Sequence, residues 1–144
     1  VFGVDPEELL NELRTARDAG SLSGETGAAR LLLYVYQERG DETGRGCIAV
    51  NRPSAQHPVG TLQRFLDEYL IGHPEARVDY IHGAGVAEEL ACSRSDAIAF
   101  LLPAMGKEEL FPTVIHDGVL PRKTFSMGEA HDKRFYLEAR RIRV

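Results

Sequence analysis

The residues best suited to chemistry lie in one stretch near the end of the 144-residue chain. Between Pro121 and Arg134, cations, hydroxyls, a glycine, carboxylates and an imidazole follow one another with few large apolar side chains. A packed core does not require such a mixture, whereas functional loops are commonly polar and held by a rigid scaffold. We therefore predict that residues 121–133, hereafter the basic loop, contribute to a binding site.

The cations and hydroxyls of the basic loop suit an anionic small molecule. Arg122 and Lys123 would hold a phosphate or carboxylate, and the hydroxyls of Thr124 and Ser126 would donate hydrogen bonds to it. Gly128 has no Cβ, so it would let the backbone approach the ligand closely. The alternative is that these charges are solvated and pair with carboxylates elsewhere, each pair contributing about 0–1 kcal/mol.

Two side chains of the basic loop are candidate proton-transfer groups. Glu129 and His131 qualify because imidazole titrates near neutral pH and a carboxylate can act as an acid or base. Neighbouring side chains point apart in a strand or a helix, so His131 and Asp132 would form a dyad only in a turn. The sequence leaves open whether the chain is an enzyme.

His82 is a further candidate contact for the ligand. It ends a predicted strand and precedes residues 83–85, and open sheets with crossover helices bind ligands at the carboxyl ends of their strands. The same Gly-Ala-Gly pattern is also an ordinary strand-to-helix turn, and it lacks the lysine of a phosphate-binding loop. We predict that His82 and the basic loop border one common site.

Composition restricts the class of protein. With 43% hydrophobic and 27% charged residues, the chain has the make-up of one globular domain. Its longest apolar runs are far shorter than the span of about 30 Å that a bilayer core requires, and two cysteines do not form a disulfide framework. We expect a cytoplasmic protein without a membrane partner. The five histidines have no metal-ligand spacing, so the sequence indicates no metal, and it identifies no cofactor.

The net charge of −5 is unevenly distributed along the chain. Residues 1–120 hold ten Lys and Arg against nineteen Asp and Glu, whereas residues 121–144 hold seven against three. Nucleic-acid binding usually needs a broad basic face with stacking aromatics, which an acidic chain without tryptophan lacks. A small anionic metabolite is the expected partner, nucleic acid is not, and self-association through the basic tail stays open.

Two helices are predicted from their apolar spacing and end signals. Residues 6–19 carry leucines at helical spacing, with Asp5 to cap the free amides and Gly20 as a stop. Residues 62–70 show the clearest amphipathic pattern of the chain and end at Gly72.

Three segments have strand patterns in the first and last parts of the chain. Residues 30–37 are apolar on both faces, which predicts a central strand. The polar residues 39–46 predict a hairpin loop into an antiparallel strand over residues 46–51. Residues 134–144 alternate apolar and polar side chains, which predicts a strand with one solvated face, or alternatively a helix.

From residue 77 onward the predicted elements alternate, and crossover connections of this kind favour parallel pairing. Pro112 lies within the last helix, which we expect to be short, kinked or divided near Phe111. The expected elements are strands over residues 77–82 and 97–102 and helices over residues 86–92 and 107–116. The predicted fold class is therefore α/β, with α+β as the alternative: one domain with a mixed sheet and four helices packed on it.

Three segments carry a resemblance to a known family: Tyr80-Ile81-His82-Gly83, Phe100-Leu101-Leu102-Pro103 and the run from Pro121 through Ile142. Together they resemble the C-terminal portion of a bacterial and archaeal family called domain of unknown function 1015. The resemblance covers residues 77–142. It implies that residues 1–144 are the C-terminal portion of a longer architecture, and the first residue, Val1, likewise leads us to expect a preceding segment. It also implies a role with serine or phosphoserine.

The sequence therefore leaves two classes of function. The first is binding or turnover of a small anionic metabolite such as serine or phosphoserine, by phosphotransfer or phosphate hydrolysis. The second is a non-catalytic module that stabilises a larger protein or self-associates.

Overall fold

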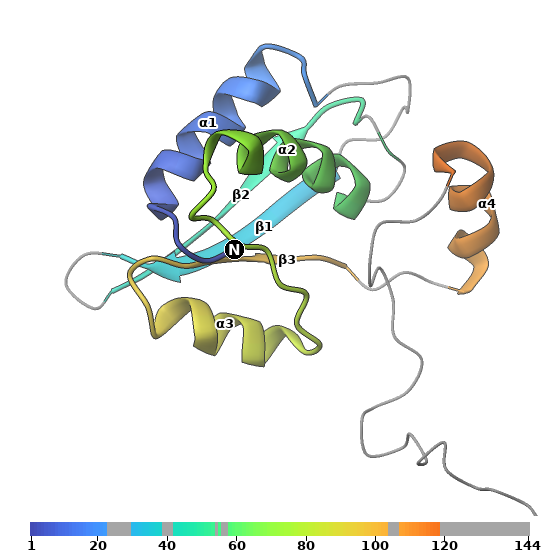
Figure 1. The fold of residues 1–144 in the computed structure, drawn as a ribbon. Helices are drawn as coiled ribbons and strands as arrows, with labels where there is room; N and C mark the ends of the chain where they lie inside the picture. Colours follow the sequence, from blue (N-terminus) through green and yellow to red (C-terminus); the bar gives the residue numbers. More distant parts are fainter. Residues whose placement is uncertain (23–29, 39–41, 54, 56–57, 104–106, 119–144) are drawn as a thin grey trace, which may run out of the picture.

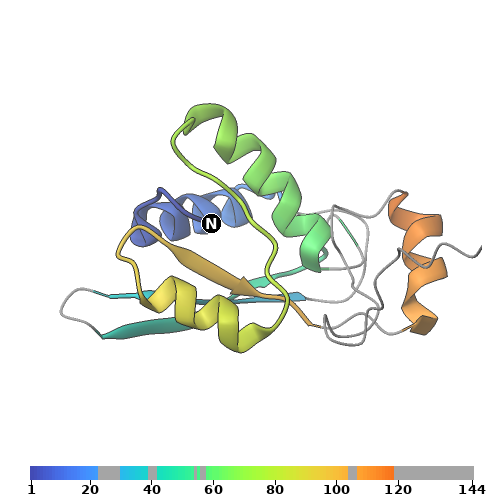
Figure 2. The ribbon, with the colours of Figure 1, turned by 60° about the horizontal axis from the view of Figure 1, so that its bottom comes forward.

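The computed structural model shows a three-stranded sheet with helices on both of its faces (Figures 1 and 2). It describes residues 1–22, 30–38, 42–53, 55, 58–103 and 107–118. The described elements, in chain order, are α1 (Pro6–Asp18), β1 (Arg30–Gln37), β2 (Thr43–Val50), α2 (Pro58–Gly72), α3 (Ala84–Cys92), β3 (Ile98–Leu101) and α4 (Lys107–Asp117). The predicted α/β class is confirmed, and so are the four helices.

Helix α1 begins and ends through the contacts that its sequence predicts. The carboxylate of Asp5 accepts hydrogen bonds from the backbone N–H groups of Glu7 and Glu8, at 2.9 and 3.2 Å. Gly20 follows the helix with a φ of +80°, and its N–H donates to the carbonyl of Arg17 at 3.0 Å. These bonds satisfy backbone groups that the ends of a helix leave without partners.

The hairpin of β1 and β2 is confirmed, and β1 is the central strand with the order β2-β1-β3. Strand β2 starts at Thr43, earlier than predicted, so part of the expected loop is strand. Gly44 lies opposite Tyr36, and a Cβ at Gly44 would lie 2.5 Å from the tyrosine ring. The glycine is therefore needed to accommodate an aromatic ring across the sheet, not to form a turn.

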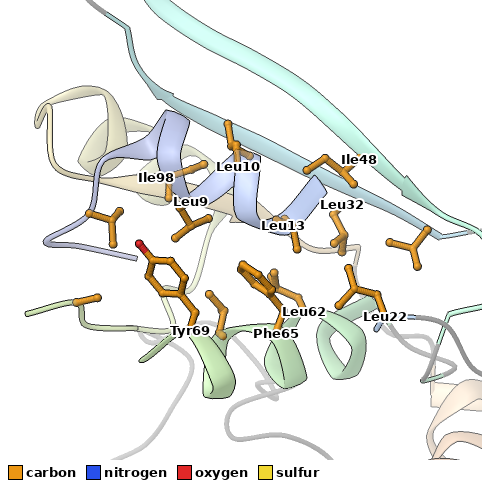
Figure 3. Close-up of a cluster of buried hydrophobic side chains, with 14 residues drawn as sticks. Leu9, Leu10, Leu13, Leu22, Leu32, Ile48, Leu62, Phe65, Tyr69 and Ile98 are labelled. Atoms are coloured by element: carbon orange, nitrogen blue, oxygen red, sulfur yellow. The ribbon is translucent and has the colours of Figure 1, made fainter. Parts of the chain in front are cut away.

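The main core lies between the sheet and the helices α1 and α2, while α3 covers the opposite face (Figures 2 and 3). Leucines of α1, aromatic and leucine side chains of α2, and one face of the sheet meet there. Members include Leu9, Leu10, Leu13, Leu32, Ile48, Leu62, Phe65, Leu66, Tyr69 and Ile98.

The expected parallel pairing is wrong for the described strands, because β3 pairs antiparallel with β1, with Leu33 opposite Leu101. The mixed sheet that this pairing would have given is therefore not observed among them. Residues 77–82 are not a strand either: within this segment Arg77 forms an isolated bridge, and the remainder is irregular. A strand requires a partner along its length, and here the bridging partner is the short segment at Phe2.

Helix α4 runs through Pro112 as one continuous helix, so it is short but not divided. It lies beside the sheet rather than on it in both views (Figures 1 and 2). Accordingly, Phe111 is 74% exposed and Ile115 is 78% exposed. Among the helices described here, none has the length and apolar character to cross a membrane.

The buried phenol of Tyr69 predicts a loss of stability at alkaline pH. Burial, together with the carboxylates of Glu12 and Glu8, raises its pKa to about 12. The folded-state pKa thus exceeds the unfolded value of about 10, so the stabilisation is complete below pH about 10 and is lost as the pH rises towards about 12. We expect the variant Tyr69→Phe to lose less stability than the native chain between pH about 9 and about 11. Urea midpoints at both pH values measure this, and an equal decline in the two proteins would contradict it.

Candidate functional site

Most of the predicted site lies outside the described residues. This applies to the basic loop and to the predicted final strand at residues 134–144. It therefore includes Arg122, Lys123, Thr124, Ser126, Gly128, Glu129 and His131. The exception is His82, which is exposed and follows irregular chain instead of ending a strand.

His82 lines a cavity of about 730 Å³ at the outer edge of the sheet. Residues 78–83 form one side of it, and residues 97–103, which include β3, form the other. Helices α2 and α3 border it from the two faces of the sheet, and Val1 and Phe2 close one end. We call this cavity the edge slot. Its volume is in the range of about 300–1,000 Å³ that is typical of ligand sites.

The N-terminal segment enters the edge slot as a very short strand. Phe2 forms antiparallel bridges with Arg77 on one side and with Ala97 on the other. The N–H of Phe2 donates to the carbonyl of Arg77 at 2.8 Å, and the N–H of Arg77 donates back at 2.9 Å. On the opposite side, the N–H of Ile98 donates to the carbonyl of Val1 at 3.0 Å. Phe2 thus lies between the segments at Arg77 and Ala97, which are separated by the width of one strand.

Side-chain contacts fix Phe2 in this position. The guanidinium of Arg94 lies over the Phe2 ring, 5.6 Å from its centroid, within the range of a cation–π contact. Arg94 in turn donates two hydrogen bonds of 2.8 Å to the carboxylate of Asp96. This partner holds the pKa of the Asp96 carboxyl below its usual value. The ion pair therefore orients the cation that covers Phe2.

Beyond Val1, the two flanking segments line the edge slot. Groups of alternate residues in a strand face the same side, so in β3 Phe100 follows Ile98, whereas residues 78–82 on the other side are irregular. Within the described part of the chain, no backbone hydrogen bond joins Asp79 or Ile81 to another residue. Because strands lie about 4.8 Å apart, two segments that both pair with Phe2 lie about 10 Å from each other. This spacing is the width of one inserted strand.

The faces of the edge slot are largely apolar. Helix α2 contributes Val59, Leu62 and Leu66, and helix α3 contributes alanines. The polar residues are few: the hydroxyl of Tyr80 donates a hydrogen bond to the side-chain oxygen of Gln63, and Asp79 and His82 also line the slot. Among these described lining residues there is no Lys or Arg.

The terminal amine of Val1 lies at the closed end of the edge slot. The amine of Val1 donates a hydrogen bond of 2.8 Å to the carbonyl of Ile98. Burial lowers the pKa of this amine to about 6, although the Asp79 carboxylate acts in the opposite direction.

The described residues contain no candidate metal centre. No cluster of three or more His, Cys, Asp or Glu side chains that could hold a metal is found among them. The two thiols, Cys47 and Cys92, are both free and are not among the residues lining the slot. The edge slot therefore offers backbone hydrogen bonds and apolar contacts to a ligand.

Comparisons with known proteins found no matching family model, no matching curated protein and no matching solved structure. The resemblance to the domain of unknown function 1015 therefore stays a prediction. The edge slot was not foreseen from the sequence. The strand-like pattern of residues 77–82 does not show which neighbour that segment has, so the slot depends on contacts that only the fold creates.

Proposed function

We propose that this domain is a non-catalytic module that accepts an extended, apolar polypeptide segment in the edge slot. The segment enters in line with Val1 and runs antiparallel to both flanking segments. The observation that carries this proposal is the double bridge of Phe2, which begins a ladder on two sides at once. Continued past Val1, the same ladder reaches the backbone groups of Asp79, Ile81 and Phe100.

The inserted segment must be apolar on both faces, because helices cover the slot from both sides. Residues 134–144 do not meet this requirement: Glu138 and Arg140 would be buried whenever Leu137 faces the opposite helix. The other segments outside the described residues are shorter or richer in polar side chains. We therefore propose an apolar segment from outside residues 1–144 as the occupant.

Extending the chain before Val1 tests the proposal directly. A short extension of Val and Ile residues should add ladder hydrogen bonds of about 0.5–1.5 kcal/mol each, and the ordering of the new residues offsets part of this gain. We expect the melting temperature to rise by about 3–6 °C. Amide hydrogen exchange should slow at Asp79, Ile81 and Phe100 and stay unchanged on the remote helix α1.

The matched control is an extension of the same length with proline at alternate positions. Proline has no N–H to donate and is excluded from the middle of a sheet, so this extension should give no protection. A free peptide of the Val and Ile sequence should reproduce the protection at high concentration if covalent linkage is not needed. If the Val and Ile extension changes neither exchange nor melting temperature, the proposal is wrong.

A second candidate function is binding of a small anionic metabolite such as serine or phosphoserine. It is supported by the start of helix α3, where Gly83 and Ala84 line the edge slot. No side chain caps this helix and its first turn has no acidic residue, so its free amides favour an anion. Arg122, Lys123 and Ser126 would then orient the anion, and Glu129 or His131 would transfer a proton in a phosphotransfer or hydrolysis reaction.

Calorimetric titration separates this second candidate from the first. Phosphoserine should bind the native chain and bind the variant Arg122→Ala at least about tenfold more weakly, which corresponds to the loss of one charge-assisted contact. Equal binding to both proteins, or none to either, contradicts the anion site while leaving the strand-accepting slot intact.

A further inference from the structure

The Phe2 ladder fixes which residues an inserted segment would meet. Val1 pairs with Ile98 and Phe2 with Ala97, so each step upstream of Val1 moves one residue further along β3. The first, second and third upstream positions therefore lie opposite Ala99, Phe100 and Leu101. On the other side, the Arg77 bridge fixes the register at Phe2, and the irregular residues 78–82 line the slot beyond it.

The same register assigns each upstream position to one face of the sheet, because residues directly opposite each other share a face. Phe100 packs against the core that α1 and α2 cover. Tyr80 reaches the same side, since its hydroxyl bonds to Gln63 of α2. The second upstream position thus faces α2. Strand residues alternate between faces, so the first and third positions face α3.

The two faces leave different amounts of room. Helix α3 lines the slot with Ala84, Ala87 and Ala91, which are spaced three and four residues apart and so form one stripe. On the α2 side, the slot is lined by the large side chains of Leu62 and Leu66. A helix with alanines facing a sheet leaves space that large strand side chains must fill, because protein interiors are close-packed.

We infer that the edge slot selects a segment with large apolar side chains at the first and third upstream positions and a small one at the second. This inference rests on the proposed function and adds to it a side-chain pattern and a register. The segment is thereby recognised by the alternation of its side-chain sizes rather than by charge.

Two extensions of identical composition test the pattern. Read towards Val1, Ala-Ile-Ala-Ile places isoleucine opposite Ala99 and Leu101, whereas Ile-Ala-Ile-Ala shifts every side chain to the other face. We expect exchange at the amides of Ile81 and Phe100 to be about tenfold slower with the first extension than with the second. The first extension should also give the higher melting temperature.

Filling the alanine stripe should remove this preference. In the variant Ala87→Leu, the added side chain occupies the space next to α3, so the difference between the two extensions should disappear. The matched control is Val86→Leu on the same helix. Val86 is 51% exposed and is not among the residues that line the slot, so this variant should keep the full difference between the two extensions. If Ala87→Leu does not fold by circular dichroism, the more exposed Ala84→Leu takes its place.

The possible outcomes are distinguishable. Equal protection by the two extensions, or greater protection by Ile-Ala-Ile-Ala, overturns the inferred pattern but leaves the strand-accepting slot supported. Protection by neither extension overturns the slot itself. A preference that persists in both Ala87→Leu and Ala84→Leu shows that the alanine stripe does not set the pattern, and it also overturns the inference.

Discussion

Replacing Leu32 with alanine is expected to lower the free energy of unfolding by about 2–5 kcal/mol. Leu32 lies at the centre of β1, is fully buried and contacts the core formed with α1 and α2 (Figure 3). Its removal costs the transfer of the side chain from water and leaves a cavity that a sheet flanked by two helices cannot easily close. Urea unfolding followed by circular dichroism measures the change.

The neighbouring residue on the same strand provides the control. Leu31 has the same side chain and the same strand environment, but it points to the opposite face and is 54% exposed. The variant Leu31→Ala should therefore cost less than about 1 kcal/mol. If the two variants lose similar stability, the assignment of the core to one face of β1 is wrong.

Replacing Gly3 with alanine is expected to cost about 2–4 kcal/mol, because two effects act at one position. Gly3 has a φ of +71°, a conformation that residues with a Cβ rarely adopt. In addition, a Cβ there would lie 2.6 Å from the carbonyl oxygen of Glu75. Relief of this clash should displace Phe2 from its double bridge. We therefore also expect faster hydrogen exchange at the amide of Arg77, which that bridge protects.

The variant Gly20→Ala separates the two effects. Gly20 has a similar φ of +80°, but no atom lies within 4 Å of the position that its Cβ would take. Its replacement should cost only the conformational term of about 1 kcal/mol and should leave the Arg77 amide unchanged. Equal losses for the two glycines would show that contact with Glu75 does not hold the N-terminal segment.

The elements that follow from local chemistry could be predicted from the sequence. Helix α1 has both a capping aspartate and a terminal glycine, and α2 has five apolar residues at helical spacing. Strand β1 is apolar on both faces, which predicted a central strand, and its position between β2 and β3 confirms this, although Leu31 and Leu33 on the face opposite α1 and α2 are 54% and 45% exposed. Each of these features depends on residues close together in the chain.

Features that depend on partners distant in the chain could not be predicted. The alternation of elements after residue 77 favoured parallel pairing, yet β3 takes the free edge of β1 in the antiparallel sense. The sequence predicted that Gly44 lies in a loop. The reason for glycine there is instead the ring of Tyr36 on the neighbouring strand, a contact that local sequence does not show. Residues 77–82 have the composition of a strand, but within this segment only Arg77 forms a bridge to a neighbouring segment.

The candidate site likewise has one part that could be identified from the sequence and one part that could not. The basic loop was identified from a concentration of polar side chains, and its residues lie outside the described part of the chain, so its role stays a prediction. The edge slot arises from three segments, near residues 1, 77 and 98, that are brought together only by the fold. Apart from His82, its lining residues have no chemical signature that sequence reasoning could detect.

The outer margin of β3 has a further consequence for the behaviour of this chain in solution. Its residues Ile98–Leu101 carry no charge and no proline, the two features that commonly prevent sheets of separate molecules from joining. The recessed position of this margin between α2 and α3 shields it from such joining. Binding of the proposed segment in the edge slot would cover this margin and so would favour solubility as well as recognition.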